Sequence, residues 1–297
     1  MEHFFKSFIL STVFLISACS SGGDNQSPST GTLSLGMTDG PVENASQVVV
    51  TFSGVEVHGA ENKEFTLDPA VSINLLDYQG ENRVLLLDDE TLAAGTYQWM
   101  RLIVDESTSF IEINGQQYPL SIPSGAKTGL KLNKGFTIGS DSSSDFTIDF
   151  DLKKSVHQTG NGVYKLRPTL RIVDSLNVSS ITGTVDDSLI ESVDCDNNGD
   201  NNDTGNSVYV LGGPNATVQD IQGDENDPVA STNVEYNSET QLYEFVLAYM
   251  PVGEYTAVFT CDAVLDIADE DNSDVVNFSA SLEVSVVADE TANIAFD

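Results

Sequence analysis

The sequence predicts an all-β protein, with two β-sandwich domains in tandem after a lipoprotein signal peptide and a flexible tether. Many short runs of β-branched or alternating residues are bounded by Gly, Pro, Asn, Asp and Ser, which is the pattern of sandwich or barrel strands. No stretch beyond the first residues keeps helical spacing for three turns. The fold class follows from these two observations.

The first 18 residues have the parts of an export signal. A short polar start containing Lys6 precedes the apolar run Phe8–Ile16, which is too short to span a bilayer, and two small residues precede Cys19. This pattern is typical of a bacterial lipoprotein signal and predicts cleavage of residues 1–18 and diacylation of Cys19. The alternative is an ordinary buried thiol in a retained helix.

Residues 19–30 are expected to form a flexible tether. They are rich in Ser, Gly, Asn and Pro, and they contain too little apolar surface to fold. By analogy with sorting in Gram-negative bacteria, Ser20 after the lipid site favours the outer membrane. The predicted location is therefore the cell envelope, with the periplasmic and the outward face both open.

The first sandwich is predicted for residues 31–176. Gly54 interrupts a long β-branched run and predicts a bulge, and Asn114-Gly115 predicts a two-residue hairpin turn. Leu85–Ala94 is a candidate short helix, and Thr38–Pro41 is expected to form a tight turn after the first strand. Strands are expected at Thr32–Met37, Gln47–His58, Val71–Leu75, Tyr97–Val104, Leu130–Leu132, Phe146–Leu152, Val163–Arg167 and Leu170–Val173.

A short linker near Asp174–Ser180 leads to the second sandwich, which is predicted for residues 180–297. Its strand-forming segments are Ile181–Val185, Ser207–Gly213, Tyr243–Cys261, Phe278–Val286 and Ala292–Phe296.

Charge separates the two halves. The net charge is −34, and the segment from Asn177 onward holds 25 Asp and Glu but no Lys, Arg or His. Such a field excludes nucleic acid as a partner and disfavours anionic lipid surfaces, so the acyl chains must supply the membrane contact. An acidic solvated surface and binding of divalent cations both remain open.

Five segments of the first domain carry a family resemblance. They are GTLSLGMTDGPVENASQVVVTFSGVEVH (31–58), LAAGTYQWMRLIV (92–104), IPSGAKTGLKL (122–132), FTIDFDLKKSVH (146–157) and YKLRPTLRIV (164–173). In this order they resemble the bacterial family catalogued as domain of unknown function 4382 (DUF4382). The resemblance implies a secreted or lipid-anchored β-sandwich module without an assigned activity.

The segment Met250–Ala257 (MPVGEYTA) resembles the closing part of carboxypeptidase-regulatory-like and transthyretin-like sandwich domains, in which a Pro/Gly turn leads into a strand that starts with Tyr. This resemblance implies a stalk, a spacer or a ligand-presenting sandwich of about seven strands.

An Asp/Asn-rich insertion in the second domain is a candidate calcium loop. Side-chain oxygens at alternate positions with Gly199 at the sixth resemble the calcium loops of EF-hands and thrombospondin-type repeats. Gly205 stands where a bidentate Glu is expected, so a weak site or an acidic loop without metal are both open. The candidate ligands are Asp194, Asp196, Asn198, Asp200 and Asn202.

Once Cys19 is lipidated, Cys195 and Cys261 remain as one candidate disulfide in an oxidising compartment. A metal site or two separate thiols are the alternatives.

Charged residues within the strands of the first domain predict ion pairs. Arg101, Arg167 and Arg171 lie in or beside apolar strands, while Asp149 and Asp151 lie two residues apart on one strand. Pairing between them is the first expectation, because an unpaired buried charge is costly. A binding cleft or a pair of catalytic carboxylates would use the same groups.

Two functions follow. The first is a non-catalytic, lipid-anchored envelope protein with a binding or structural role, which calcium could assist and whose partner would be a glycan or another envelope protein. The alternative is an envelope polysaccharide hydrolase that uses Asp149, Asp151 or Asp105 in a groove beside Trp99. No nucleophile elbow, zinc spacing or nucleotide fingerprint supports other enzyme classes.

Overall fold

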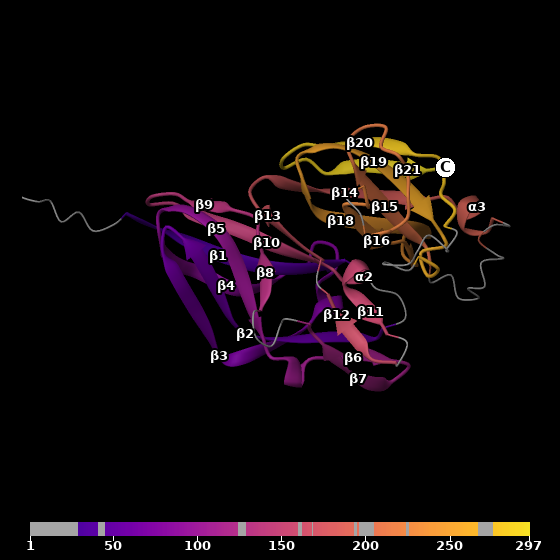
Figure 1. Ribbon diagram of the computed structural model, residues 1–297. Coiled ribbons are helices and arrows are strands. Elements are labelled where there is room, and N and C mark those ends of the chain that lie inside the picture. The colour runs from indigo at the N-terminus through magenta and orange to yellow at the C-terminus, as the bar shows by residue number, and fades with distance from the viewer. Residues whose placement is uncertain are drawn as a thin grey trace, which may run out of the picture.

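Strands dominate the computed structural model, in which two sandwiches follow one another along the chain (Figure 1). The structure describes residues 29–40, 45–123, 129–159, 162–167, 169–192, 195, 205–223, 226–266 and 276–297. The expected all-β class is confirmed. None of the helices in these ranges is long and apolar enough to cross a membrane.

One sheet of the first domain has the strand order β13-β10-β1-β4. It consists of β1 (Thr30–Gly40), β4 (Val84–Ala93), β10 (Ser143–Asp151) and β13 (Thr169–Asp174). β1 pairs with β10 in parallel, and the other pairs are antiparallel.

The facing sheet has the order β11-β12-β7-β6-β2-β5-β8, with β3 paired to β2 and β9 paired to β5. Its strands are β2 (Gln47–Gly59), β3 (Asn62–Asn74), β5 (Gly95–Val104), β6 (Phe110–Ile113), β7 (Gln116–Ser121), β8 (Leu130–Leu132), β9 (Phe136–Ile138), β11 (Val156–Gln158) and β12 (Tyr164–Leu166).

Two local predictions for this sheet are confirmed. The register of β2 shifts between Phe52 and Gly54 against both of its long neighbours, as expected for a bulge. A Cβ atom on Gly54 would lie 2.7 Å from the carbonyl oxygen of Phe65, so the close approach requires glycine. The Asn114-Gly115 turn between β6 and β7 has positive φ at both residues, 52° and 75°, as its hairpin type demands.

Two other predictions are wrong. Leu85–Ala94 forms no helix, because it lies in β4 and pairs with β1, so sheet formation overrides its weak helical pattern. Thr38–Gly40 does not turn but continues β1 beside β10, which carries Asp39 into the protein interior. Short helical turns occur instead at η1 (Leu75–Tyr78), η2 (Glu106–Thr108) and α2 (Leu152–Ser155).

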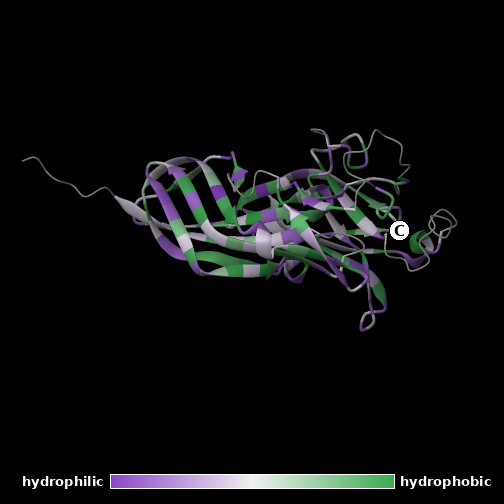
Figure 2. Cartoon of the chain, turned by 60° about the horizontal axis from the view of Figure 1, so that its bottom comes forward, coloured by the Kyte–Doolittle hydropathy of each residue, from purple (hydrophilic) through white to green (hydrophobic). Residues whose placement is uncertain are grey.

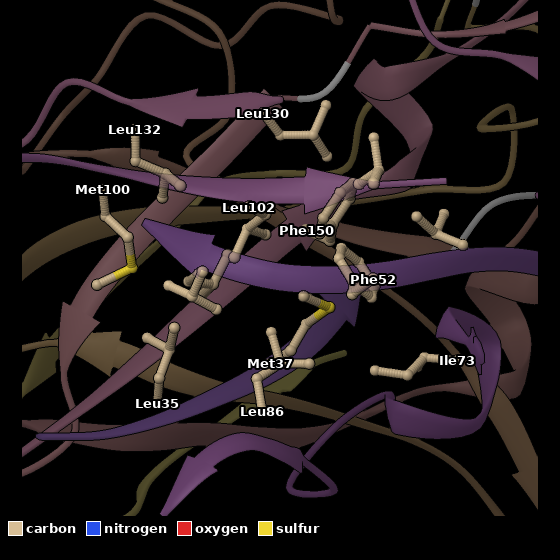
Figure 3. Close-up of a cluster of buried hydrophobic side chains, with 14 of the residues drawn as sticks. Leu35, Met37, Phe52, Ile73, Leu86, Met100, Leu102, Leu130, Leu132 and Phe150 are labelled. Carbon is tan, nitrogen blue, oxygen red and sulfur yellow. The ribbon is translucent and has the colours of Figure 1, made fainter. Parts of the chain in front are cut away.

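The core of the first domain lies between its two sheets. Leu35 and Met37 of one sheet and Phe52 and Leu102 of the other are fully buried and point toward one another (Figure 3). Hydrophobic and hydrophilic residues alternate as bands along many of the strands (Figure 2), as expected for strands with one buried face. Burial of apolar surface on one face of each sheet holds the sandwich together.

The second domain has two sheets that share a second core. One has the order β17-β18-β14-β21, with β14 (Val178–Val185), β17 (Glu235–Asn237), β18 (Leu242–Pro251) and β21 (Ala292–Phe296). The other has the order β16-β15-β19-β20, with β15 (Ser207–Gly212), β16 (Ala230–Asn233), β19 (Gly253–Thr260) and β20 (Leu282–Val286). A short helix, α3 (Asp187–Ile190), follows β14.

Candidate functional site

Many of the predicted site residues lie outside the described ranges. Cys19 and the rest of the leader are among them. So are all five candidate calcium ligands, Asp194, Asp196, Asn198, Asp200 and Asn202. Within the described ranges, no three His, Cys, Asp or Glu side chains are grouped so that they could hold a metal ion. Lipidation and calcium binding therefore stay predictions.

The two remaining cysteines lie together in the second domain. Cys195 and Cys261 form a disulfide with 5.5 Å between their Cα atoms, and both are buried in the second core. The bond links Cys195, which follows α3 in the chain, to Cys261, the residue directly after β19. The two cysteines are 66 residues apart in sequence.

The predicted carboxylates of β10 are engaged in ion pairs. Asp149 accepts hydrogen bonds from Nη2 and Nε of Arg171, at 2.5 and 3.1 Å, so the expected pair between these two residues is confirmed. Asp151 accepts from the backbone N–H of Lys154, whose Nζ lies 3.7 Å from the same carboxylate. Arg101 pairs instead with Glu56, its cross-strand neighbour, at 2.8 Å.

The other residues of the hydrolase hypothesis lie elsewhere. Trp99 lies in the larger sheet, where its ring stacks on His58 with centroids 4.9 Å apart and contacts the cation of Lys131 at 4.6 Å. Asp105 caps η2 through Ser107, and these hydrogen bonds lower its pKa. Neither Trp99 nor Asp105 lines the space beside Asp149 and Asp151, which measures about 30 Å³.

The two domains are tied together by a lysine. Lys153 of α2 is only 6% exposed, and its Nζ donates a 2.5 Å hydrogen bond to the carbonyl oxygen of Ala263 in the second domain. The same ammonium lies 5.8 Å from the ring centroid of Tyr209, whose hydroxyl donates to Asp266 at 2.6 Å. Burial raises the pKa of Asp266 to about 6, and the nearby Lys153 limits the rise.

Further polar contacts support this junction. Nζ of Lys154 donates to the carbonyl oxygen of Pro228 and lies 3.9 Å from Asp227. The hydroxyl of Tyr249 donates to the carbonyl oxygen of Glu81 at 3.1 Å. Charges of the first domain therefore dock the second domain, a role that strand patterns in the sequence do not reveal.

Asp39 is a residue that the sequence interpretation missed. It is 5% exposed, and neither oxygen of its carboxyl makes a hydrogen bond of ordinary geometry to the described residues. Burial raises its pKa well above the usual value, and the charges of Asp149 and Asp151 raise it further. The amides of Leu152 and Gly40 approach the carboxyl and offset part of the effect.

Replacing Asp39 with Asn should stabilise the protein at neutral pH. Because the folded-state pKa is raised, the folded chain binds a proton more tightly than the unfolded chain, and its stability falls as the pH rises above about 4. Asn cannot ionise, so the Asp39→Asn variant should gain about 1 to 3 kcal/mol at pH 8 and little at pH 4. Urea unfolding at both pH values measures this. An equal change at both would contradict the assignment.

A larger open groove runs along the junction, with a volume of about 670 Å³. The first domain contributes Gln79 and Gly80, and the second contributes residues of β16, β17 and β18. Tyr236 lines the groove and is 53% exposed, with Tyr243 packed against its edge at 5.2 Å between centroids. The lining also includes Glu235, Glu239 and Glu244.

No curated protein matches the chain. Solved structures with some likeness include a leucine-rich repeat protein from Bacteroides thetaiotaomicron (11% identity, TM-score 0.20), the TIE protein of Bacillus anthracis (12%, 0.19) and a fimbrial protein from Bacteroides ovatus (9%, 0.21). The alignments cover 90%, 90% and 91% of this chain but 26%, 34% and 49% of those chains. Such low TM-scores carry no argument about function.

The family comparison concerns the first domain. The model described as Domain of unknown function (DUF4382) matches residues 30–168. This range includes β1 to β12, and it contains nearly all of the segments on which the predicted resemblance rests. Residues 30–168 of this chain are therefore a DUF4382 domain.

Proposed function

We propose that this protein is a non-catalytic, lipid-anchored protein of the bacterial cell envelope with a binding or structural role. The observation that carries the proposal is that charged residues of the first domain are engaged in structural contacts. Asp149 pairs with Arg171, Asp151 neighbours Lys154, and Lys153 reaches into the second domain. The first two contacts hold strands and a helix of the first sandwich together, and Lys153 holds the two sandwiches together, which is a structural role.

The hydrolase alternative gains no support from this geometry. A glycoside hydrolase needs two carboxyl groups flanking a sugar, one of them free to donate a proton. Asp149 is held by a guanidinium, and the 30 Å³ space beside it is far smaller than the several hundred Å³ that ligand pockets occupy.

Anchoring at Cys19 fits the placement of the chain ends. The first described residues and the C-terminus lie at opposite ends of the molecule in two views (Figures 1 and 2). A lipid on Cys19 and the tether to residue 30 would hold the DUF4382 domain nearer to the membrane and extend the acidic domain away from it. We propose the outer membrane as the site, with a glycan or another envelope protein as the partner.

Calcium would act in the second domain. The candidate loop 194–203 includes Cys195, which is buried in the second core and bonded to Cys261. Calcium would neutralise part of the charge of a domain that carries 25 acids and no base from Asn177 onward.

Replacing Cys19 with Ala should release the protein from the membrane. The wild-type chain should incorporate an alkyne-labelled fatty acid and sediment with membranes, whereas the Cys19→Ala variant should carry no label. The matched variant Ser20→Asp should keep the label but move to the inner membrane, because the residue after the lipid site directs sorting. Label on the Cys19→Ala variant, or none on the wild type, would refute the anchor.

A further inference from the structure

The groove at the domain junction has the size and position of a ligand site. Its volume of about 670 Å³ falls within the range of roughly 300 to 1,000 Å³ that small-molecule sites occupy, and such sites are frequent between domains. Neither domain forms it alone, since Gln79 and Gly80 belong to the first and β16 to β18 to the second. Docking of the domains therefore creates the groove.

An exposed aromatic ring dominates one part of its lining. Tyr236 lies on β17, which is an edge strand of its sheet among the described residues. The residue is 53% exposed. Tyr243 lies directly opposite on β18 and packs against Tyr236 at an interplanar angle of 60°. This contact supports the Tyr236 side chain while leaving much of it open to solvent. A supported, exposed ring offers an apolar surface to a flat ligand.

Around the ring, the lining is polar and uncharged or negative. Asn233, Asn237 and Ser238 of the second domain line the groove, as does Gln79 of the first domain, and the Asn237 amide also donates to Glu244. Such groups donate to and accept from hydroxyl-rich ligands. The aromatic ring and the surrounding hydrogen-bonding groups together suit a sugar ring, which has an apolar face and a hydroxylated rim.

Charge restricts the class of sugar. None of the described residues that line the groove is Lys, Arg or His, whereas Glu235, Glu239 and Glu244 all line it. Hydrogen bonds from Asn237 and Thr240 lower the pKa of Glu244, so this carboxylate is ionised at neutral pH. Glu235 lies directly opposite it on β17. A uronate, sulfated or phosphorylated sugar would be repelled.

We propose that the junction groove binds a neutral glycan, with one sugar ring stacked on Tyr236. The inference rests on the binding role proposed above and names its ligand class. Hydroxyl groups of the sugar donate to the Glu and Asn oxygens, and Gln79 contacts the ligand from the first domain.

Calorimetric titration of the purified full chain tests this directly. The probes are cellobiose, maltose and N,N′-diacetylchitobiose, with digalacturonate as the anionic counterpart of similar size. At least one neutral disaccharide should bind saturably with a dissociation constant of about 1 mM or below, and digalacturonate at least tenfold more weakly. No saturable binding of any neutral probe, or equal binding of digalacturonate, overturns the proposal.

Variants locate the site. Tyr236→Ala should weaken binding about tenfold or more, and Tyr236→Phe should change it less than about threefold, because the ring makes the contact. Gln79→Ala should also weaken binding, which tests the contribution of the first domain. Val252→Ala is the matched control, since Val252 is 51% exposed and does not line the groove. Wild-type affinity in the folded Tyr236→Ala variant would refute the site.

The outcome can be separated from that of the anchoring test. If Cys19 is lipidated but no sugar binds, the envelope role stands and only this inference fails. If sugar binds through Tyr236 but Cys19 carries no lipid, the groove stands and the anchor fails.

Discussion

Replacing both Cys195 and Cys261 with Ser should lower the free energy of unfolding by about 4 kcal/mol. The disulfide closes 66 residues, and on the chain-entropy model a loop of that length restricts the unfolded chain by this amount. The segment that it closes includes β15, β16 and β18, so the whole second core is affected. Urea unfolding of the full chain measures the loss.

The comparison needs a control for buried polarity, because Cys195 and Cys261 are 8% and 6% exposed. The double variant with Ala in place of both cysteines introduces no hydroxyl and should lose a similar amount. Treating the wild type with a reductant should lower its stability to nearly the same level. A peptide map under non-reducing conditions should show the linked peptides. Two free thiols in the folded wild type would contradict the bond.

Replacing Lys153 with Met should cost about 3 kcal/mol, because the change removes a buried charged hydrogen bond to the carbonyl oxygen of Ala263 and a positive charge that lowers the pKa of Asp266. The ammonium of Lys153 is the group of the first domain that contacts Ala263 and Tyr209, and its charge lowers the raised pKa of Asp266. Met has a similar length and keeps the apolar contacts of the stem. The loss therefore reports on the ammonium group, through its charge and its hydrogen bond to Ala263.

The pH dependence of this loss distinguishes the effect of the Lys153 charge on Asp266 from the loss of packing and of the hydrogen bond to Ala263. The pKa of Asp266 is about 6 in the folded chain and lower in the unfolded chain, so its proton stabilises the fold at low pH, and this contribution disappears as the pH rises through 6. Without Lys153 the folded-state pKa rises further. The difference between wild type and Lys153→Met should be smaller at pH 4, where the lost hydrogen bond to Ala263 remains as a cost, and largest at pH 8.

Lys134 provides a matched control for the loss of one positive charge. Its Nζ donates to the carbonyl oxygen of Ile172 within the first domain, at 3.1 Å. Lys134→Met should cost less, with no dependence on the protonation of Asp266. If Lys153→Met lost the same amount of stability at pH 4 and pH 8, the charge of Lys153 would have no effect on the ionisation of Asp266. By loosening the contact between the two domains, Lys153→Met should also weaken sugar binding in the junction groove.

Several features could be predicted from the sequence because their causes are local. Gly54 breaks a β-branched run at the bulge of β2, and Asn114-Gly115 supplies the two positive φ angles of a tight hairpin. Ion pairing of the Arg and Asp residues of the apolar strands was expected because an unpaired charge there is costly, and the structure shows Arg171 with Asp149 as one such pair. The DUF4382 segments were recognisable in order along residues 31–174, and the family model matches residues 30–168.

Other features depended on contacts between distant residues. The segment Leu85–Ala94 has weak helical spacing, but most of it pairs with β1 and forms β4. Asp39 looked like a turn residue because Gly and Pro follow it, yet parallel pairing with β10 extended the strand and buried the carboxyl. A turn pattern describes the chain over four residues, and it contains no information about a strand paired over 100 residues away.

By itself, the sequence determined that this protein is all-β, that its charge separates into two halves, and that its first domain carries the DUF4382 pattern, because alternation, turn residues and composition are written along the chain. Only the tertiary structure decided that Lys153 enters the second domain, that Asp39 is buried near Asp149 and Asp151, and that a groove opens beside Tyr236. Each of these depends on which surfaces of the two sandwiches meet. Residues far apart in sequence determine which surfaces meet. The free energy of their burial and charge pairing depends on contacts in both domains together.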